Sequence, residues 1–403
     1  MTRHTTRRRA PRHLAVLAAA VTALGAAPLA LAADGDAGSA VMSWGAGRTG
    51  QLGNGALADS HTPVAVSGLT RTGVDQISAG GTSSADAFAL ARTSTGTVTA
   101  WGHNSAGQLG AGSDVDSASP QAVSGLTRIM DVAAGGRHAL AVDTAGRAYA
   151  WGDDTYGQLG DSRTGADRTL PDRVTGLPEV KQVAAGCDFS LALAQDGTVY
   201  SWGRGVDGQL GTGSRATSST PQQVKGLADV VQIEAGCQDA LALLSDGTVK
   251  SWGANGDGQL GNSSTASSAV PVDVDWLEGV NDIEAGASTN FARTADGHVW
   301  GWGDNQYGQL LEGAEPFAAG AERADRTAPV EIPRLEGVTH LAVGARSAAA
   351  VAGDDVLTWG DNSEGQLGDG TTTAGFDAVR AVRSGAAVKG VAVSLGGNTT
   401  YAY

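Results

Sequence analysis

Residues 202–211, with the sequence Trp-Gly-Arg-Gly-Val-Asp-Gly-Gln-Leu-Gly, decide the fold because their pattern returns seven times along the chain. In every copy Trp-Gly is followed, six residues after the tryptophan, by Gly-Gln-Leu. The repeat tryptophans are Trp44, Trp101, Trp151, Trp202, Trp252, Trp302 and Trp359, at spacings of 57, 50, 51, 50, 50 and 57 residues. A period of about fifty residues predicts one structural unit copied seven times.

Each repeat contains the signals of four short β-strands. In one repeat a run of β-branched residues and alanine occupies 180–185, and alternating segments at 189–193 and 198–202 flank Asp196-Gly197. Asp-Gly between two alternating segments is a strong hairpin signal, because both residues tolerate the positive φ of a tight turn. A fourth segment at 221–224 follows the polar loop after Gly-Gln-Leu-Gly. Four strands per repeat are typical of a propeller blade.

The two ends of the chain match complementary parts of one repeat. Residues 41–44 correspond to the third strand of a repeat, and residues 398–403 correspond to the second. A seventh blade would therefore take two strands from each end of the chain, and ring closure would remove the exposed edges that promote aggregation. We predict an all-β, seven-bladed propeller over residues 41–403, closed by pairing of N- and C-terminal strands. Each repeat tryptophan, once buried, would contribute up to about 4–6 kcal/mol to its stability.

The repeats resemble those of the regulator of chromosome condensation family. The shared pattern runs through Ala-Gly, a Leu-Ala-Leu strand, Trp-Gly and Gly-Gln-Leu-Gly, and it extends over about residues 41–403. This resemblance implies a seven-bladed propeller closed by pairing of the termini. The chain departs from the pattern in three respects: only His138 keeps the family's histidine after Ala-Gly, Leu311 replaces the last motif glycine of the sixth copy, and Ser394 takes a glycine position in the last repeat.

The first 32 residues have the composition of a secretory signal peptide. Five arginines precede an uncharged run from Leu14 to Ala32, which ends in Ala30-Leu31-Ala32. A charged start, an apolar middle and a small-residue end are the features of such a signal. The alternative is a membrane anchor, which we disfavour because the run is mostly weakly apolar alanine. We expect cleavage after Ala32, a linker over residues 33–40, and a secreted, extracellular bacterial protein without stable membrane insertion.

Composition and charge limit the class of partner. Glycine accounts for 60 of 403 residues and aromatic residues for only 5%, which favours turns over helices. The chain carries a net charge of −15, and loss of residues 1–32, which contain five arginines and no acidic residue, would bring it to −20. Such a charge repels phosphate backbones and anionic membranes. We therefore expect a monomer that binds no nucleic acid.

The sequence shows no catalytic motif, and we interpret its three matches to the dinucleotide pattern G-x-G-x-x-G, at 45–50, 203–208 and 256–261, as parts of the repeat's own turn, because the pattern needs a following helix. It lacks a P-loop, H-E-x-x-H and G-x-S-x-G, and its seven histidines are scattered. Acidic and amide residues after Trp-Gly, such as Asp153-Asp154 and Asp361-Asn362, suggest either calcium ligands or side chains that cap turns. We favour turn caps, because a calcium loop gathers several oxygens from one segment and usually ends in a glutamate. We predict no metal, no cofactor and no catalytic residue.

Cys187 and Cys237 follow Ala-Gly in adjacent repeats, fifty residues apart. In an exported protein two cysteines at equivalent places can form a disulfide, provided that their Cα atoms lie within roughly 4.4–6.8 Å. Neighbouring blades do not guarantee this distance. The other interpretation is a pair of buried, small hydrophobic side chains, and the sequence leaves both open.

Positions that vary among otherwise similar repeats are candidates for recognition. The four residues between Trp-Gly and Gly-Gln-Leu vary in this way and should share one rim. Tyr156 and Tyr307 would be exposed aromatic residues there, a type enriched in binding hot spots, or would pack on the next loop. Insertions at about 82–86 and within 311–329 are further candidates, because long loops on a rigid scaffold often carry function. The second insertion carries the candidate residues Glu315, Phe317, Arg323 and Asp325.

These observations favour a secreted, non-enzymatic propeller that binds a protein partner through one rim. Inhibition of an extracellular enzyme is one version, since the β-lactamase inhibitory proteins of soil actinobacteria have similar, though shorter, repeats. One alternative is an extracellular propeller enzyme, a lyase or hydrolase with polar residues at one mouth of the channel, because a fold does not decide a function. Guanine nucleotide exchange, the activity of the family's namesake, is disfavoured by the signal peptide and the acidic chain.

Overall fold

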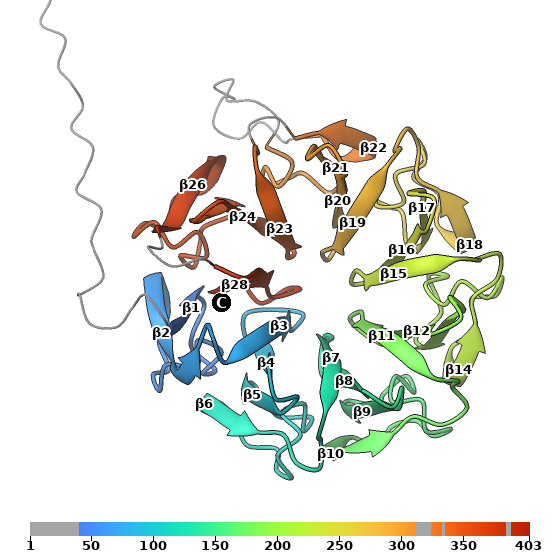
Figure 1. Ribbon diagram of the computed structural model, residues 1–403, viewed down its shortest axis with the longest axis horizontal. Coiled ribbons are helices and arrows are strands. Elements are labelled where there is room, and N and C mark those ends of the chain that lie inside the picture. Colours follow the sequence, from blue (N-terminus) through green and yellow to red (C-terminus); the bar gives the residue numbers. More distant parts are fainter. Residues whose placement is uncertain (1–39, 312–323, 333–334, 384–387) are drawn as a thin grey trace, which may run out of the picture. The chain divides into compact units, whose positions relative to one another are not determined.

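The computed structural model describes residues 40–311, 324–332, 335–383 and 388–403, which form seven four-stranded antiparallel sheets arranged in a ring (Figure 1). The prediction of an all-β, seven-bladed propeller is confirmed. In this part of the chain no helix is long and apolar enough to cross a bilayer.

Six blades are continuous in sequence, and their strands are numbered from the channel outward. Blade 1 contains β3 (Val74–Gly80), β4 (Phe88–Thr93), β5 (Val98–Gly102) and β6 (Ser117–Ala122). Blade 2 contains β7 (Ile129–Ala134), β8 (His138–Asp143), β9 (Ala148–Gly152) and β10 (Arg168–Arg173). Blade 3 contains β11 (Val180–Ala185), β12 (Phe189–Ala194), β13 (Val199–Gly203) and β14 (Ser218–Gln223).

The second half of the ring follows the same order. Blade 4 contains β15 (Val230–Ala235), β16 (Asp239–Leu244), β17 (Val249–Gly253) and β18 (Ser268–Asp273). Blade 5 contains β19 (Val280–Ala285), β20 (Thr289–Thr294), β21 (Val299–Gly303) and β22 (Arg326–Glu331). Blade 6 contains β23 (Val338–Val343), β24 (Ser347–Ala352), β25 (Asp355–Gly360) and β26 (Gly375–Arg383).

Blade 7 joins the two ends of the chain. From the channel outward it contains β27 (Val391–Val393), β28 (Thr399–Ala402), β1 (Ala40–Gly45) and β2 (Ser60–Thr70). β1 pairs antiparallel with β28, with Met42 opposite Ala402 and Trp44 opposite Thr400. The closure predicted from the phase of the two ends is confirmed, with two strands from each end.

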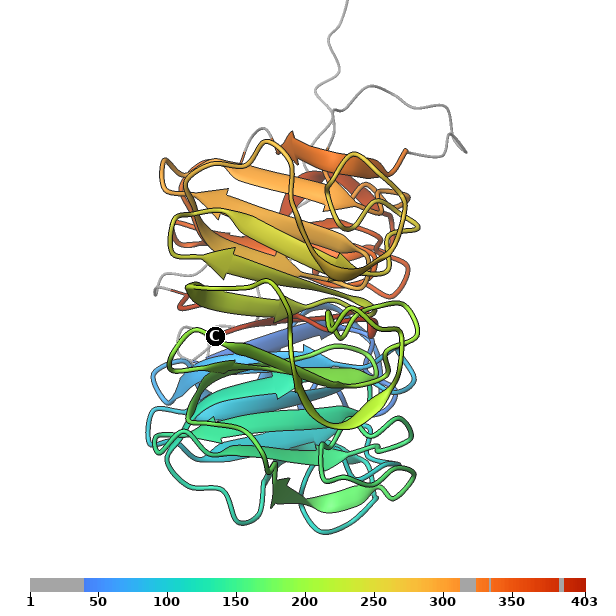
Figure 2. The ribbon, with the colours of Figure 1, turned by 90° about the vertical axis from the view of Figure 1, so that its right-hand side faces the viewer.

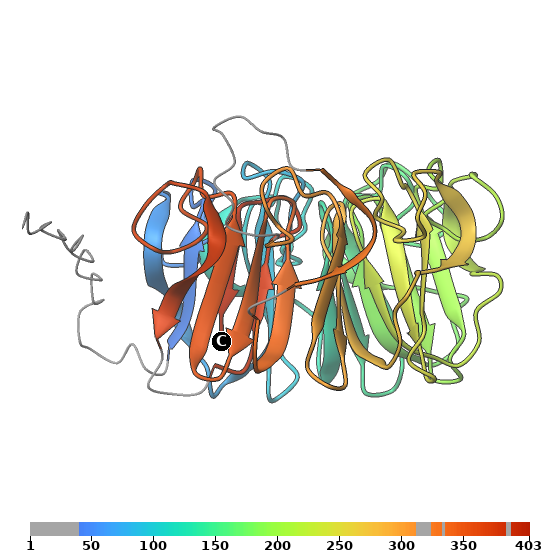
Figure 3. The ribbon, with the colours of Figure 1, turned by 90° about the horizontal axis from the view of Figure 1, so that it is seen from above.

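The strands run across the thickness of the ring, so their connections gather on its two faces (Figures 2 and 3). We call one face the turn rim, because it carries the seven turns between Trp-Gly and Gly-Gln-Leu. These turns comprise residues 46–49, 103–106, 153–156, 204–207, 254–257, 304–307 and 361–364. We call the opposite face the hairpin face. It carries tight turns such as Asp196-Gly197, together with the linkers that lead from each outer strand to the next inner strand.

The repeat tryptophans explain why the two motifs recur at a fixed spacing. All seven are fully buried, and each indole N–H donates a hydrogen bond to the main-chain carbonyl of the glutamine in the preceding Gly-Gln-Leu motif, at 2.6–2.9 Å. The pairs are Trp101–Gln51, Trp151–Gln108, Trp202–Gln158, Trp252–Gln209, Trp302–Gln259, Trp359–Gln309 and Trp44–Gln366. Because a buried indole N–H needs an acceptor, the motif ties each blade to the next, including the closing pair.

The glycine that ends the motif makes room for the next tryptophan. In six repeats this glycine has a φ of +63° to +70°, and a Cβ on Gly160 would lie 2.9 Å from Nε1 of Trp202. Leu311 occupies the same place in the sixth repeat and keeps the left-handed conformation, with a φ of +47°. A side chain there costs about 1–2 kcal/mol in backbone strain. Leu311 offsets part of that cost by burial in the cluster that contains Trp359.

The hydrophobic core is divided among the interfaces between blades. Seven clusters of buried side chains occur in the described residues, and each draws on two adjacent blades. Between blades 3 and 4, for example, Phe189 and Leu191 pack in one cluster with Ile233 and Trp252. No blade therefore has a complete core of its own, which is the general property of repeat proteins.

A disulfide joins Cys187 to Cys237 and so links blades 3 and 4. Their Cα atoms are 4.5 Å apart, at the short end of the range that a disulfide requires. Both cysteines lie in the loops between the first and second strands of their blades, where the backbone N–H of Cys187 also donates to the carbonyl of Cys237 at 3.2 Å. Of the two alternatives that the sequence left open, the structure contains the disulfide.

Candidate functional site

The turn rim is built on a backbone that the motif itself holds in place. In all seven repeats the glutamine Oε1 accepts a hydrogen bond from the backbone N–H two residues earlier, at 2.8–3.0 Å. The same glutamines supply the carbonyls that receive the tryptophan N–H groups. Each turn is therefore fixed from inside the protein, and its outward side chains can vary without changing the backbone.

Asparagine side chains complete several turns, in agreement with the turn-cap interpretation. The Asn255 amide donates to the carbonyls of Ser264 and Ala266, and its Oδ1 accepts from the backbone N–H of Leu260. Asn104 and Asn362 make the same set of bonds. Every one of these polar atoms is used by the backbone. In the described ranges, no three His, Cys, Asp or Glu side chains are grouped so that they could hold a metal ion.

Asp154 stands at the asparagine position in blade 2 and is poorly satisfied there. Its Oδ1 accepts from the backbone N–H of Leu159 at 3.1 Å, whereas the buried Oδ2 has no hydrogen-bond partner. Burial raises the pKa of the Asp154 carboxyl to about 6, and the nearby carboxylates of Asp161 and Asp153 add to the shift. A carboxylate in this place lacks the amide donors that asparagine gives to backbone carbonyls.

Both predicted rim tyrosines pack against an arginine of the next blade. Tyr156 is 38% exposed, and the guanidinium of Arg204 lies 5.9 Å from its ring centroid. Tyr307 is half-buried, with the guanidinium of Arg346 4.8 Å from its ring centroid. The structure thus combines the two alternatives, since each tyrosine packs on its neighbour and still reaches the surface. A role for either residue in binding stays a prediction.

Of the two insertions, the first lies wholly within the described residues and the second only in part. Residues 82–86 form a closed loop in which the Asp86 carboxylate accepts from the backbone N–H groups of Thr82 and Ser83 at 2.9 and 2.7 Å. In the second insertion, Asp325 accepts from the backbone N–H of Asn305 and thereby holds a rim turn. The remaining candidates Glu315, Phe317 and Arg323 lie outside the described residues.

The ring encloses a central cavity of about 240 Å³, lined by the inner strands of all seven blades. Glutamines bridge several neighbouring inner strands, which do not pair with each other. The Gln182 side chain, for example, donates to the carbonyl of Ile233 at 2.9 Å and accepts from its N–H at 3.0 Å. Gln76 and Gln232 do the same to Val132 and Ile283. These glutamine hydrogen bonds therefore connect the inner strands of neighbouring blades around the cavity.

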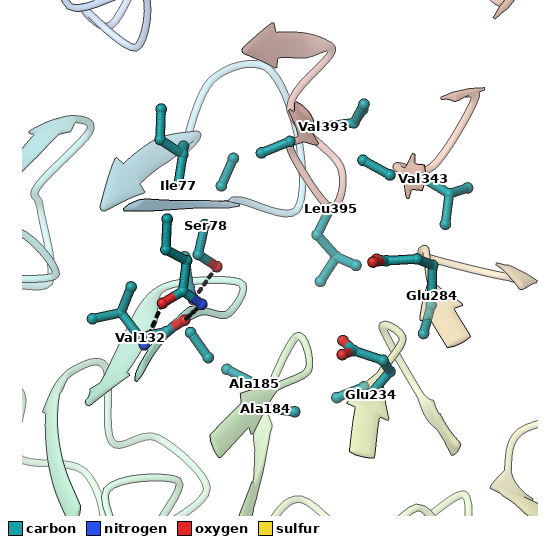
Figure 4. Close-up of a pocket in the computed structure, with 18 of the residues that line it drawn as sticks. Ile77, Ser78, Val132, Ala184, Ala185, Glu234, Glu284, Val343, Val393 and Leu395 are labelled. Carbon is teal, nitrogen blue, oxygen red and sulfur yellow. Dashed lines mark hydrogen bonds between the residues drawn. The ribbon is translucent and has the colours of Figure 1, made fainter. Parts of the chain in front are cut away.

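Glu234 and Glu284 project into the cavity side by side from blades 4 and 5 (Figure 4). The equivalent positions in other blades carry only serine or alanine, and no lysine or arginine in the described part of the chain lines the cavity. Both side chains touch the channel space but are surrounded by protein, and this burial raises the pKa of Glu234 to about 8 and that of Glu284 well above its usual range. The pair can therefore hold protons at neutral pH.

Two further titratable side chains are buried between blades. His138 Nε2 lies 2.9 Å from the Ser190 hydroxyl, and burial lowers the pKa of His138 to about 4. Asp239 accepts from the Asn290 amide at 2.8 Å, and burial raises the pKa of Asp239 to about 8. Both side chains are 0% exposed, so they link adjacent blades and cannot meet a substrate.

Residues 40–402 match the model of the RCC1-like domain. The chain belongs to the RCC1-like domain family. The Arabidopsis thaliana ultraviolet-B receptor UVR8 is 36% identical over 181 residues, which are 44% of this chain and 40% of the receptor. The Homo sapiens E3 ubiquitin-protein ligase HERC2 is 35% identical over 196 residues, which are 46% of this chain and 4% of the ligase. The chain thus matches less than half the length of either relative.

Solved structures support the fold of this RCC1-like propeller. Yeast RCC1 in complex with Kap60 superposes with a TM-score of 0.78 at 22% identity, over 90% of this chain and 88% of that one. Human WBSCR16 gives a TM-score of 0.75 at 23% identity, over 90% of this chain and 98% of the other. At this level of identity the likeness concerns the architecture alone.

Sequence reasoning missed two features of the propeller. One is the glutamate pair, which strand alternation would reveal, because both residues stand two positions before the glycine of Ala-Gly. The other is an exposed tryptophan: Trp276 is 74% exposed and lies outside the repeat motif. Alignment of the linkers would have found it, because four other repeats have glycine at its position, at Gly68, Gly125, Gly176 and Gly226.

Proposed function

We propose that the chain is an extracellular protein-binding propeller, which presents its turn rim to a protein partner and performs no chemistry of its own. The observation that carries this proposal is the shared construction of the seven turns. The glutamine and tryptophan hydrogen bonds hold every turn in one backbone conformation, while side chains such as Tyr156 and Gln306 are exposed. A surface ordered before binding loses little conformational entropy in a complex, so its contacts contribute more fully to affinity.

The relatives support a binding role for a domain of this shape. The RCC1-like family includes a receptor and a ubiquitin ligase, and yeast RCC1 has been solved in complex with Kap60. Because the chain matches only part of the receptor and the ligase, we transfer neither activity. Inhibition of an extracellular enzyme is one specific form that such binding would take.

The test compares three forms of residues 33–403. The rim variant combines Tyr156→Ala, Arg204→Ala and Gln306→Ala, and the hairpin-face control combines Glu179→Ala, Lys225→Ala and Val231→Ala. Each immobilised form is used to capture partners from the native culture medium and cell envelope. We expect a partner retained by wild type and control but reduced about tenfold by the rim variant, since hot-spot aromatic and arginine residues carry most binding energy. Equal retention by all three forms would refute the proposal.

Export is part of the proposal and has its own test. N-terminal sequencing of the protein from culture medium should begin at Ala33, because the A-x-A signature places cleavage after Ala32. Protein found only inside the cell, with Met1 intact, would contradict an extracellular role.

The cavity provides a second candidate function, acid–base chemistry in the channel. The observation that favours it is the glutamate pair with raised pKa values, together with Asp131 and His340 in the same lining. Such shifts are typical of catalytic acids as well as of structural groups. Turnover of a polysaccharide or ester substrate by wild type, lost in the Glu234→Gln, Glu284→Gln double variant with partner capture unchanged, would establish the channel as an active site.

A further inference from the structure

The hairpin face has a hollow between blades 4 and 5, far from the turn rim. Its walls include Trp276, in the linker between β18 and β19, and Trp300, on β21. The other lining side chains that matter here are the acidic and histidine residues Glu278, Asp296, His298 and Glu331. The hollow therefore combines two indole rings with three carboxylates, and among the described residues no lysine or arginine lines it.

Trp276 is unfavourable in two ways: its backbone adopts a left-handed conformation, and its large apolar side chain is exposed to solvent. Its φ of +57° lies in the left-handed region, where a bulky residue is a genuine outlier. Four other repeats place glycine there, with φ between +73° and +82°, and a Cβ on any of those glycines would meet nothing within 4 Å. The side chain of Trp276 is 74% exposed. Since neither packing nor turn geometry requires tryptophan at this place, folding does not explain it.

Trp300 supplies the second aromatic wall. It is half-buried beside the cluster between blades 4 and 5, which holds its ring in place. The equivalent residues on the third strands of the neighbouring blades 4 and 6 are Lys250 and Leu357, so the pairing of two tryptophans is confined to this interface among the described linkers.

The charged side chains of the hollow are held by a histidine. His298 Nδ1 lies 2.7 Å from Glu331 Oε1, and its Nε2 lies 3.8 Å from Asp296 Oδ2. All three side chains are at least half exposed, so they are accessible to a ligand. With Glu278 also at the surface, three negative charges face at most one positive charge. The hollow therefore attracts a cation.

We propose that this hollow binds an arginine side chain of a protein partner, at a site separate from the turn rim. A guanidinium stacks on indole faces through a cation–π interaction, for which tryptophan is the best aromatic partner. Its planar fork of N–H donors also matches a carboxylate in bidentate geometry. The hollow offers both kinds of contact within one lining, and arginine is itself enriched in the hot spots of protein interfaces.

The experiment follows the nine tryptophans of residues 33–403 by fluorine NMR after incorporation of 5-fluorotryptophan. The probes are a five-residue peptide with a central arginine and the same peptide with uncharged citrulline, both in 150 mM salt. Trp276→Gly restores the residue of four other repeats and should fold normally. The seven buried tryptophan signals report the fold in every variant, and Trp276→Gly together with Trp300→Phe assigns the two signals from the hollow.

We expect the arginine peptide to shift only the Trp276 and Trp300 signals, in a saturable way, and to bind at least about fivefold more tightly than the citrulline peptide. Trp276→Gly should weaken binding by about tenfold, and Glu331→Gln by about threefold. The matched control Asp246→Asn, in the equivalent turn of blade 4, should leave binding unchanged.

Three results would overturn the proposal. They are equal affinity for the citrulline peptide, unchanged affinity in Trp276→Gly, and binding of a neutral oligosaccharide such as cellohexaose in place of the arginine peptide. None of these results affects the rim proposal, because the rim variant of the capture experiment changes residues on the opposite face and its control changes no residue of the hollow.

Discussion

On the turn rim every blade is tied to the next by a buried indole and a motif glutamine, whereas on the hairpin face the ties are made by the main chain. There the backbone N–H of Ile129 donates to the carbonyl of Gly96 at 2.9 Å, and that of Val180 to the carbonyl of Gly146 at 3.0 Å. On the first face the buried indole and glutamine side chains add to main-chain bonds between blades, such as that from Cys187 to Cys237, whereas on the second face these ties are made by backbone groups.

This difference decides where each face can change. On the rim only outward side chains can vary, because the tryptophan, glutamine and glycine of each motif are needed by the neighbouring blade. On the hairpin face a linker residue such as Trp276 contacts little of the protein, so a new side chain there leaves the neighbours undisturbed. The rim is therefore suited to a broad binding surface, and the hairpin face is suited to a local binding pocket.

The largest effect is expected from removing the strands that close the ring, where the two ends of the chain pair. Deletion of residues 391–403 removes β27 and β28, the partner of β1, and Tyr401, whose hydroxyl donates to the carbonyl of Gln51. We expect loss of cooperative thermal unfolding and of the near-ultraviolet circular dichroism signal, because the two interfaces that flank blade 7 lose two and three of their ten buried core residues, respectively.

A circular permutant separates this pairing from chain order. Joining Tyr403 to Ala40 through a short Gly-Ser linker and opening the chain at the exposed residue Gly176 keeps every strand pair. The permutant should melt within a few degrees of wild type. A deletion variant that melts like wild type would show that blade 7 does not close the ring.

The next largest effect should distinguish the buried repeat tryptophans from the exposed Trp276. Trp202→Ala removes a fully buried side chain and its hydrogen bond to Gln158, so we expect a loss of about 3–5 kcal/mol in unfolding free energy from urea titration. Trp276→Gly relieves left-handed strain and exposes no core, so we expect stability equal to wild type or higher by about 1 kcal/mol. Comparable losses in both variants would remove the proposed distinction between the faces.

The channel glutamates should make stability depend on pH. In the unfolded chain Glu234 ionises near pH 4.5, but in the folded protein it ionises only near 8. Over this interval the folded state retains a proton that the unfolded state has released, so the free energy of unfolding falls as pH rises from about 4.5 to 8. As pH rises over this interval, the free energy of unfolding of the wild type should fall by on the order of 2 kcal/mol more than that of the Glu234→Gln, Glu284→Gln double variant. Urea titration at pH 5, 7 and 9 measures this difference. Parallel pH profiles would contradict the raised pKa values.

The smallest effect concerns a single rim turn. Asp154→Asn would give blade 2 the side chain that caps the turns of blades 1, 4 and 6, with amide donors for the carbonyls nine and eleven residues on. We expect a gain of about 1 kcal/mol at pH 7. The gain should shrink below pH 6, where protonation of Asp154 restores a donor. Asp161→Asn serves as control, and an equal gain from it would point to net charge instead of the cap.

Much of this architecture follows from the sequence, because the repeat encodes it seven times. The spacing of tryptophan and Gly-Gln-Leu predicts the blades, and the phase of residues 41–44 and 398–403 predicts the closure, since each copy confirms the interpretation of the others. Cys187 and Cys237 show the limit of this reasoning. Their equivalence indicates neighbouring loops, but only coordinates give the Cα distance that permits a disulfide.

Features confined to one blade were harder to predict. Trp276 and Trp300 belong to no repeated motif, and their shared hollow depends on a linker and a strand more than twenty residues apart. Tyr156 and Tyr307 were identified as rim residues, but the stacking arginines come from the following blades. Comparison of the repeats identifies the residues that they share. Residues that occur in one blade only are found when each position is aligned across all repeats.

The closing blade also determines how the ring would respond to force. The start of β1 lies beside the end of β28, with Met42 opposite Ala402, so a pull on the two ends in opposite directions loads the hydrogen bonds of this pair one after another. Antiparallel strands peeled from one end separate at far lower tension than strands sheared along their length. A ring stabilised by seven shared interfaces is therefore mechanically weak along one line, and tethering it by a single terminus would spare that line.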